Sequence, residues 1–336
     1  MAKRTIIFRA DGGSTIGMGH FTRTLALAEM LKEHFHCIFA TRQPTEYQIT
    51  EIEKICHGRM DLPEDDSHFE QFLTHLKGNE IVVLDNYYFN TDYQKAIKAK
   101  GCKLVCIDDM HDKHYMADVV INHAPGLNEK DFSKENYANL LLGPKYSLVK
   151  KVFRKSNSNR TEIKEYPKSL LIIFGGADFY NLTQKYIEEV IKLNVFETIN
   201  IITGNGYKYL DELKLYLSIN KSLNIHHYHD ITAEKILEIA ENTDLVIAPA
   251  STILFELLTL NKPVISGYYV DNQKGIYKGF AELDIILKMG NLNNYSELNN
   301  ILKSIKISDI NRVTSKLKNI FDDKVDMRIK SVFLTL

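Results

Sequence analysis

The chain has 336 residues, which is long for one ordinary domain and predicts two domains of about 150 residues each. Its apolar share of 44% and charged share of 25% are typical of a globular protein, and a net charge of -1 excludes a general attraction to nucleic acid or anionic lipid. No segment approaches the ~18 consecutive apolar residues of a membrane-spanning helix, and no signal peptide is recognised. We therefore expect a cytoplasmic protein without nucleic-acid partners or stable membrane insertion.

Its four cysteines form no CxxC pair, so neither a zinc site nor a disulfide framework is expected.

The first half of the chain alternates short β-rich runs with helical patterns. A strand over 5–10 precedes glycine-rich residues 12–19 and a helix that begins at about His20. Later strands are expected over 37–40, 81–85, 103–108 and 119–122, and helices over 68–77 and 91–100. This alternation predicts a parallel sheet with helices on both faces.

The second half repeats this pattern after a polar stretch, 154–168, whose composition is typical of a linker. Strands are expected over 169–174, 199–203, 225–228, 245–248 and 264–267, with a helix from about 181 to 193. We expect an N-terminal α/β domain (1–153), the linker, a C-terminal α/β domain (169–312) and a C-terminal helix (313–336) that can pack across the domains. The two domains are expected to face each other across a cleft.

The turn after the first strand is the strongest local signal for a binding site. It contains Gly12, Gly13, Gly17 and Gly19 and leads directly into a helix, where free amides and the positive helix end suit an anion. A dinucleotide site is excluded, because Thr22 replaces the third glycine of the G-x-G-x-x-G pattern and the second strand ends without a ribose-binding acid. A P-loop is excluded because no Gly-Lys-Ser/Thr follows. The alternative is a glycine turn that serves only close packing.

His20 is the ionisable side chain best placed to act at this turn. A helix N-terminus disfavours the imidazolium form, so a neutral imidazole that accepts a proton is expected. The alternative is a hydrogen-bonded structural histidine. Asp11 and Arg23 lie near enough in sequence to orient His20 or to pair with each other across the turn.

Two further signals lie in the second half. Gly175 and Gly176 follow the first strand of that half and precede its first helix, where backbone amides can hold a diphosphate. Ser251 and Thr252 follow a later strand, and Glu256 lies one helical turn after Thr252, where its carboxylate can accept hydrogen bonds from ribose hydroxyls. The alternative for this segment is an ordinary capped helix with a solvated Glu256.

The remaining candidates are weaker. Asn272 and Gln273 are neutral amides in an expected loop, suited to sugar hydroxyls. Asp85 to Tyr87 and the pair Asp108–Asp109 follow strands, where α/β folds place ligands, but adjacent acids on a strand point to opposite faces and chelate poorly. The cluster His226, His227 and His229 lacks a ligand pattern, so no metal and no cofactor is expected.

Taken together these residues resemble a known family, the bacterial UDP-2,4-diacetamido-2,4,6-trideoxy-β-L-altrose hydrolases of pseudaminic acid biosynthesis, which are related to the MurG-type glycosyltransferases of GT-B fold. The resemblance covers nearly the whole chain. It rests on the motifs Arg9-Ala10-Asp11-Gly12-Gly13, Gly17-x-Gly19-His20-x-x-Arg23, Asp85-x-Tyr87, Ile107-Asp108-Asp109, Leu142-Gly143-Pro144-Lys145-Tyr146, Phe174-Gly175-Gly176-x-Asp178, Ser251-Thr252 with Glu256, and Asn272-Gln273. The chain departs from the family pattern at Ala177 and Ala250.

The resemblance implies an α/β protein of GT-B type, with two Rossmann-like domains, and an inverting hydrolase of a UDP-sugar. The residue at His20 would activate water, Tyr87 would lie near the sugar, and Ser251, Thr252 and Glu256 would hold the nucleotide. Two alternatives remain open, a GT-B glycosyltransferase that uses a UDP-sugar donor and a non-catalytic UDP-sugar-binding protein. The sequence leaves the oligomeric state undetermined, with a monomer favoured.

Overall fold

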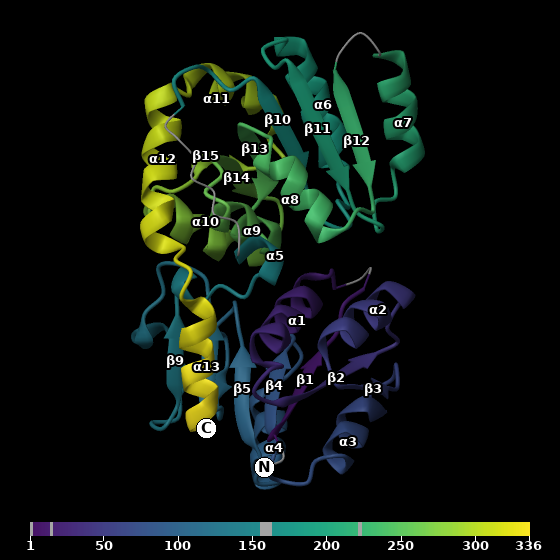
Figure 1. Ribbon diagram of the computed structural model, residues 1–336, viewed down its shortest axis with the longest axis vertical. Coiled ribbons are helices and arrows are strands. Elements are labelled where there is room, and N and C mark those ends of the chain that lie inside the picture. Colours follow the sequence, from purple (N-terminus) through teal and green to yellow (C-terminus); the bar gives the residue numbers. More distant parts are fainter. Residues whose placement is uncertain (1–2, 14–15, 155–162, 221–223) are drawn as a thin grey trace. The chain divides into compact units, whose positions relative to one another are not determined.

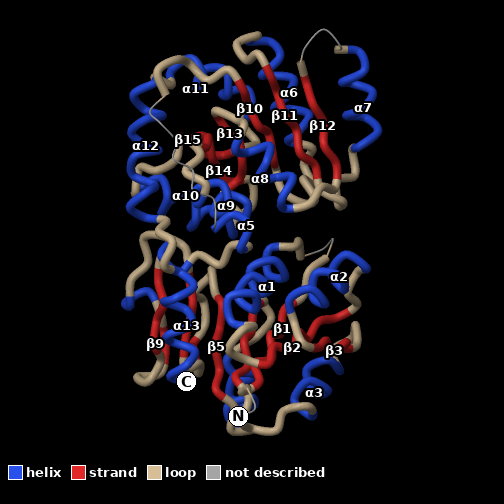
Figure 2. The backbone as a smooth tube through the Cα atoms, in the orientation of Figure 1, coloured by secondary structure: helices blue, strands red, loops and turns tan. Residues whose placement is uncertain are grey.

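The computed structural model describes residues 3–13, 16–154, 163–220 and 224–336. The chain divides into two compact units (Figure 1). Unit 1 contains residues 1–151 and 323–336, and unit 2 contains residues 152–322. In each unit a sheet of parallel strands lies among helices, as Figure 2 shows by colour.

Unit 1 is built on a seven-stranded parallel sheet in the order β3-β2-β1-β4-β5-β7-β9. Its strands are β1 (Thr5–Ala10), β2 (His36–Arg42), β3 (Gly58–Leu62), β4 (Ile81–Asp85), β5 (Lys103–Ile107), β7 (Val119–Asn122) and β9 (Asn139–Leu142). A short parallel pair joins β6 (His114–Tyr115) and β8 (Ser133–Lys134). The helices are α1 (Gly19–Leu31), α2 (Glu46–Ile55), α3 (Ser67–Thr74), α4 (Thr91–Ala99) and α13 (Val325–Thr335), with 3₁₀ turns η1 (Glu129–Asp131) and η2 (Pro144–Tyr146).

The two faces of this sheet bury separate cores, because successive strand residues point to opposite sides. On one face α1, α2 and α13 contribute apolar side chains such as Leu27, Ile52 and Phe333. On the other face α3 and α4 contribute Phe72 and Ile97. Buried on both faces, the central strands consist almost entirely of apolar residues, as parallel sheets require.

Unit 2 has a six-stranded parallel sheet in the order β12-β11-β10-β13-β14-β15. Its strands are β10 (Ser169–Ile173), β11 (Thr198–Thr203), β12 (Ile225–His229), β13 (Leu245–Pro249), β14 (Val264–Tyr268) and β15 (Leu287–Asn291). The helices are α5 (Lys151–Arg154), α6 (Leu182–Leu193), α7 (Leu210–Ile219), α8 (Ala233–Glu241), α9 (Thr252–Thr259), α10 (Asn272–Glu282), α11 (Leu298–Ser304) and α12 (Ile307–Ile320), with the 3₁₀ turn η3 (Tyr295–Glu297). Helices α6, α7, α11 and α12 share one core with the strands.

The predicted α/β class with parallel sheets is confirmed, and each predicted strand is present within about two residues of its expected ends. Five strands were not predicted, namely β3, β9 and β15 and the two short strands β6 and β8. Where the sequence predicts one C-terminal helix, the structure has two, α12 in unit 2 and α13 in unit 1. Of the predicted linker 154–168, residues 155–162 lie outside the described residues.

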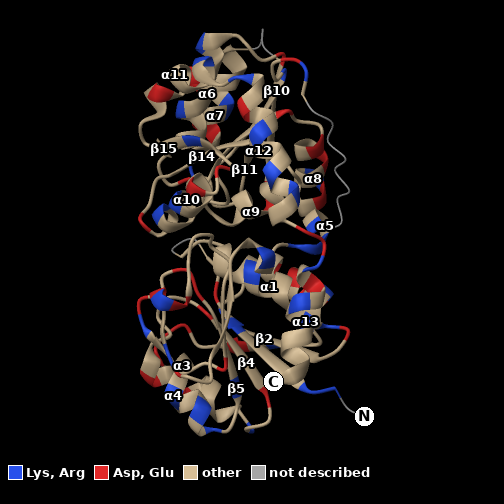
Figure 3. Cartoon of the chain, turned by 90° about the vertical axis from the view of Figure 1, so that its left-hand side faces the viewer, with Lys and Arg blue, Asp and Glu red and all other residues tan. Residues whose placement is uncertain are grey.

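Charged residues of both signs are interspersed over the helices of both units (Figure 3), in keeping with the net charge of -1. Cys102 and Cys106 are free cysteines buried in unit 1. Within the described ranges no helix has both the length and the apolar content needed to cross a bilayer.

The loops that follow β10 and β11 approach each other so closely that a side chain would not fit between them. A Cβ added at Gly204 would lie 2.6 Å from Gly176 Cα and 2.7 Å from the Gly176 carbonyl oxygen. The amide of Gly206 donates to that same carbonyl at 3.0 Å. Gly204 therefore holds the position of the turn at Gly175–Gly176.

We predict that Gly204→Ala lowers the free energy of unfolding by about 1–3 kcal/mol, because the added methyl group meets backbone that cannot yield easily. Urea denaturation followed by circular dichroism measures it. Gly275→Ala is the matched control, since that glycine lies within α10 with no atom within 4 Å of an added Cβ, and it should be neutral or slightly stabilising. Equal effects of both substitutions would contradict this account.

Candidate active site

The candidate site of unit 1 lies where the strand order of its sheet reverses. β1 pairs with β2 on one side and β4 on the other, so the loops after β1 and β4 leave the sheet at its carboxyl edge in opposite directions. Ligands of open α/β sheets bind at such a switch point. His20 follows β1, Asp85 ends β4, and the two are brought together because Ala10 and Asp85 are paired in register.

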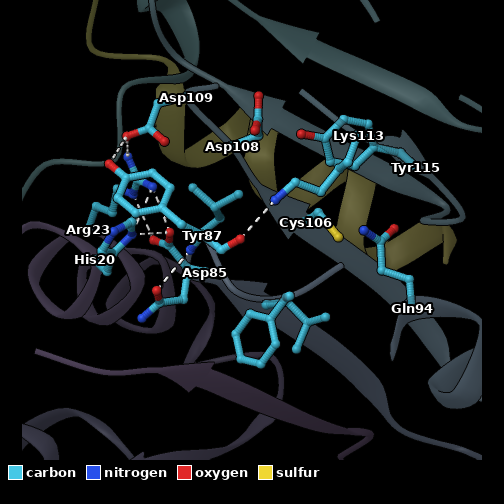
Figure 4. A pocket seen from close by; sticks show the side chains of 14 residues that line it. His20, Arg23, Asp85, Tyr87, Gln94, Cys106, Asp108, Asp109, Lys113 and Tyr115 are labelled. Carbon is cyan, nitrogen blue, oxygen red and sulfur yellow. Dashed lines mark hydrogen bonds and ion pairs between the residues drawn. The ribbon is translucent and has the colours of Figure 1, made fainter. Parts of the chain in front are cut away.

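His20 and Asp85 form a hydrogen-bonded pair (Figure 4). The Nδ1 atom of His20 lies 2.7 Å from Oδ1 of Asp85. Two lone pairs repel at this distance, so we assign the proton to Nδ1 and the donor role to His20. In the neutral imidazole, Nε2 then carries the lone pair and can accept a proton.

Arg23, one helical turn after His20 on α1, also donates to the carboxylate of Asp85. Its Nε donates to Asp85 Oδ2 at 2.7 Å and its Nη2 to Oδ1 at 2.6 Å, while Nη1 donates to Asp109 at 2.9 Å. Thr24 adds a hydroxyl donor to Oδ2 at 2.8 Å. Asp85 is fully buried, and every one of these groups stabilises its charged form.

The charged groups of this cluster shift one another's pKa values toward the ionised forms. Burial opposes ionisation of Asp85, but Arg23 and His20 outweigh it and hold the pKa of Asp85 well below its usual range. Burial likewise opposes the charge on Arg23, yet Asp109 and Asp85 raise the pKa of Arg23. Asp85 is therefore a permanent anion at neutral pH, and it holds the ring of His20 in one orientation.

Tyr87 covers the imidazole. Its ring meets that of His20 edge to face, with 4.5 Å between the ring centroids, and its hydroxyl donates to Asp109 at 3.3 Å. His20 is 4% exposed, whereas Tyr87 is 41% exposed. A substrate that reaches His20 must therefore pass beside or displace Tyr87.

The prediction that Asp11 orients His20 or pairs with Arg23 is wrong. Asp11 accepts from Arg9 at 2.5 Å, from Arg42 Nε at 2.6 Å, and from the hydroxyls of Thr41 and Tyr88. These partners hold the pKa of Asp11 well below its usual range despite its burial. Asp11 thus anchors the start of the glycine turn to β2. Asp85, not Asp11, is the carboxylate that orients His20.

The glycine turn is closed on itself. Gly13 and Gly17 exchange backbone hydrogen bonds of 3.1 and 2.8 Å, and Gly17 has a φ of +77°, which favours glycine. The first i→i−4 bond of α1 runs from Thr22 to Met18, so the helix itself does not use the amides of Gly19, His20 and Phe21. Gly19 therefore offers the expected amide donor, whereas the amide of Gly17 is already bonded.

In unit 2 the corresponding reversal lies between β10 and β13, and the two predicted turns follow these strands. Gly175, with a φ of +83°, and the exposed Gly176 follow β10. They do not themselves open a helix, because α6 begins at Leu182 and the carboxylate of Asp178 already accepts the amides of Leu182 and Thr183 at 2.8 and 2.7 Å. Any diphosphate held here would contact the turn amides and not the end of α6.

The second turn places Ser251 at the start of α9. Ser251 is the N-cap residue, and its hydroxyl forms no capping hydrogen bond. Ser251 and Thr252 are partly exposed, while Glu256 is only 6% exposed. The alternative of an ordinary capped helix with a solvated Glu256 is therefore wrong.

Asn272 and Gln273 lie at the beginning of α10, in a helix where a loop was expected. Asn272 is exposed. Gln273 is buried, and its Oε1 accepts from the amide of Tyr269 at 3.0 Å, so Gln273 braces the segment after β14.

The other polar clusters have structural partners. Asp108 accepts from the amides of Met110 and His111, whereas Asp109 faces Arg23, so the adjacent acids diverge as predicted. His227 and His229 both bond to the hydroxyl of Thr203. Among the described residues, no group of three or more His, Cys, Asp or Glu side chains is arranged to hold a metal ion.

The sequence placed Asp85 and Asp109 after strands but did not predict their bonds to His20 and Arg23, and it did not single out His123. Burial, together with the charge of Arg23, lowers the pKa of His123 to about 3, so this second histidine is neutral at neutral pH. Its Nδ1 accepts from the amide of Leu148 at 3.3 Å. His123 directly follows β7, and that position is the signal which would have found it.

Sequence comparison finds distant relatives and no matching family model. The chain is 31% identical over 283 residues to an uncharacterized protein of Methanocaldococcus jannaschii, an alignment that covers 81% of the chain and 57% of that protein. The chain thus spans little more than half the length of this relative. It is 25% identical over 273 residues to the UDP-2,4-diacetamido-2,4,6-trideoxy-β-L-altropyranose hydrolase of Campylobacter jejuni, covering 80% of the chain and 93% of the hydrolase.

Structural comparison identifies the fold. MurG of Acinetobacter baumannii matches with a TM-score of 0.66 at 13% identity, covering 99% of this chain and all of that one. The fold is that of the GT-B glycosyltransferases. Anabaena HepE, solved in complex with UDP, matches with a TM-score of 0.65 at 12% identity over 99% of this chain and all of HepE.

We predict that Asp85→Asn lowers the free energy of unfolding by about 3 kcal/mol near neutral pH, because it leaves the buried charge of Arg23 underneutralised. The folded-state pKa of Asp85 lies below the ~3.9 of an unfolded aspartate, so this stabilisation is complete above about pH 4 and is lost as the pH falls further. Urea unfolding at pH 7 and pH 3 measures the difference between wild type and variant, which should shrink at pH 3.

Asp92→Asn on α4 is the matched control, because that carboxylate is 86% exposed and pairs with Lys95 at the surface. It should change stability by less than about 0.5 kcal/mol at either pH. A difference for Asp85→Asn that is small or independent of pH would show that the buried ion pair does not stabilise the fold.

Proposed function

We propose that this protein is a nucleotide-sugar hydrolase that releases UDP from UDP-2,4-diacetamido-2,4,6-trideoxy-β-L-altrose, as the Campylobacter relative is named to do. The observation that carries the proposal is the pairing of His20 Nδ1 with the buried, ionised Asp85, which leaves Nε2 as a proton acceptor at a ligand-binding switch point. A place in nonulosonate (pseudaminic acid) biosynthesis and a cytoplasmic location belong to the same proposal.

In the proposed reaction His20 acts as a general base. Nε2 takes a proton from water, the water oxygen attacks the anomeric carbon, and the bond from that carbon to the UDP oxygen breaks with inversion. Asp85 stabilises the imidazolium that forms, because its negative charge lies 2.7 Å from Nδ1. General-base assistance of this kind contributes roughly 10²–10⁴-fold in rate.

Unit 2 would bind the UDP leaving group. The turn amides of Gly175 and Gly176 would face the diphosphate, and preorganised amides stabilise the charge that develops on a leaving phosphate. Ser251 and Thr252 would offer hydroxyls at the start of α9, and the buried Glu256 would accept hydrogen bonds from the ribose. Asn272 and Gln273 would complete the substrate side from α10. Neither a metal nor a cofactor is part of this proposal.

Two other functions use the same fold. A glycosyltransferase would pass the sugar to an acceptor hydroxyl. The similarity in fold to solved GT-B proteins favours this alternative. A non-catalytic protein would bind the UDP-sugar and leave it intact. Release of UDP from the sugar nucleotide in the absence of any acceptor separates the hydrolase from both.

We predict that His20→Asn retains UDP binding and lowers kcat by about 10²–10⁴-fold, because asparagine keeps a polar group beside Asp85 but cannot take up the proton. Released UDP and a calorimetric titration with UDP measure the two quantities. The matched control is His75→Asn at the exposed end of α3, which should leave both unchanged. Turnover of His20→Asn within a few-fold of wild type would exclude His20 as the base.

A further inference from the structure

Two exposed aromatic rings follow the turn of unit 2 that is proposed to hold the diphosphate. Phe179 and Tyr180 come three and four residues after Gly176, in the loop between β10 and α6. Phe179 is 44% exposed and Tyr180 is 48% exposed. The loop leaves the carboxyl edge of a parallel sheet at its switch point, where α/β folds bind ligands, and ligand sites are lined mainly by apolar and aromatic side chains. The two rings are therefore candidates for ligand contact.

The backbone that carries these rings is held in an unusual conformation. Asp178 and Asn181, the residues on either side of them, have φ values of +40° and +51°, which residues other than glycine seldom adopt. Oδ1 of Asn181 accepts from the hydroxyl of Tyr207, and the carbonyl of Tyr180 accepts from Nζ of Lys185 at 2.8 Å. Costly backbone conformations persist at binding sites because surrounding contacts hold them. The loop thus presents the rings at the surface of unit 2.

Tyr180 also contacts the segment that follows β14. Its ring meets that of Tyr269 edge to face, with 5.9 Å between the ring centroids. Tyr269 is partly buried, and its amide donates to the side chain of Gln273. Tyr180 therefore lies close in sequence to the turn proposed for the diphosphate, and through Tyr269 it is connected to the start of α10, which is proposed for the sugar.

We infer that Tyr180 is a substrate-binding residue whose ring packs against an apolar face of the sugar. The inference rests on the proposed UDP-sugar substrate, in which the sugar is bonded directly to the diphosphate. That sugar carries methyl groups at C6 and on both acetamido groups, so burial of its surface against an aromatic ring is favourable. The ribose is assigned to Glu256 on α9, so the nucleotide does not require this ring.

Calorimetric titration measures the contact in the His20→Asn background, where turnover should be too slow to consume the ligand. The probes are UDP and UDP-2,4-diacetamido-2,4,6-trideoxy-β-L-altrose. We expect Tyr180→Ala to weaken binding of the UDP-sugar about three- to tenfold and to change the affinity for UDP by less than about 1.5-fold. An unchanged affinity for UDP would also show that the substitution leaves the turn at Gly175–Gly176 intact.

Two further variants complete the test. Tyr180→Phe keeps the ring, so it should bind both ligands as its parent does. Tyr137→Ala is the matched control, because Tyr137 is 53% exposed and precedes β9 at the amino edge of the unit 1 sheet, and it should leave both affinities unchanged. Equal losses for UDP and the UDP-sugar in Tyr180→Ala would place the ring against the nucleotide and overturn the inference. Unchanged affinities in Tyr180→Ala, or the same loss in Tyr180→Phe, would overturn it as well.

The outcome separates this inference from the proposed function. If Tyr180→Ala weakens binding of the UDP-sugar alone but the chain with His20 intact releases no UDP, the hydrolase proposal fails and the inference holds. If that chain releases UDP but Tyr180→Ala binds the UDP-sugar as its parent does, the inference alone fails. If neither ligand binds, both fail.

Discussion

The buried salt bridge between Arg23 and Asp85 is the interaction on which the site in unit 1 depends. Both side chains lie within the protein, where a lone charge would be costly, and each is held charged by the other. The geometry follows from the topology, because the residues come from the first turns of α1 and from the end of β4, which pairs with β1. His20 shares the same carboxylate, so its orientation is a consequence of a bond that also stabilises the fold.

The two sheets place different groups at the same topological position. In unit 1 the switch point gathers ionisable side chains, whereas in unit 2 it gathers backbone amides and hydroxyls at Gly175–Gly176 and Ser251–Thr252. Charged side chains suit proton transfer, and fixed neutral donors suit a diphosphate that must be released again. This difference supports the assignment of the base to unit 1 and of UDP to unit 2 in the proposed mechanism.

The sequence predicted the strands well because parallel strands covered on both faces are continuous apolar runs, as over Ile81–Asp85 and Leu245–Pro249. β3 was missed because Arg59 and Asp61 make this edge strand polar, and β15 because Lys288 and Gly290 interrupt its apolar pattern. His20 was found from its place after a glycine turn. Its partner Asp85 was underrated, because contacts between residues 65 positions apart depend on strand order, which local patterns do not specify. For the same reason Asp11 was expected beside His20 or Arg23, whereas it pairs with Arg9 and Arg42.

In the proposed reaction, water activated beside His20 attacks the anomeric carbon of a UDP-sugar. The most direct test is hydrolysis of UDP-2,4-diacetamido-2,4,6-trideoxy-β-L-altrose in ¹⁸O-water without an acceptor, followed by mass spectrometry of both products. We expect one ¹⁸O atom at C1 of the free sugar and none in UDP. Label in UDP would show attack at phosphorus, and the absence of any free sugar would contradict the hydrolase.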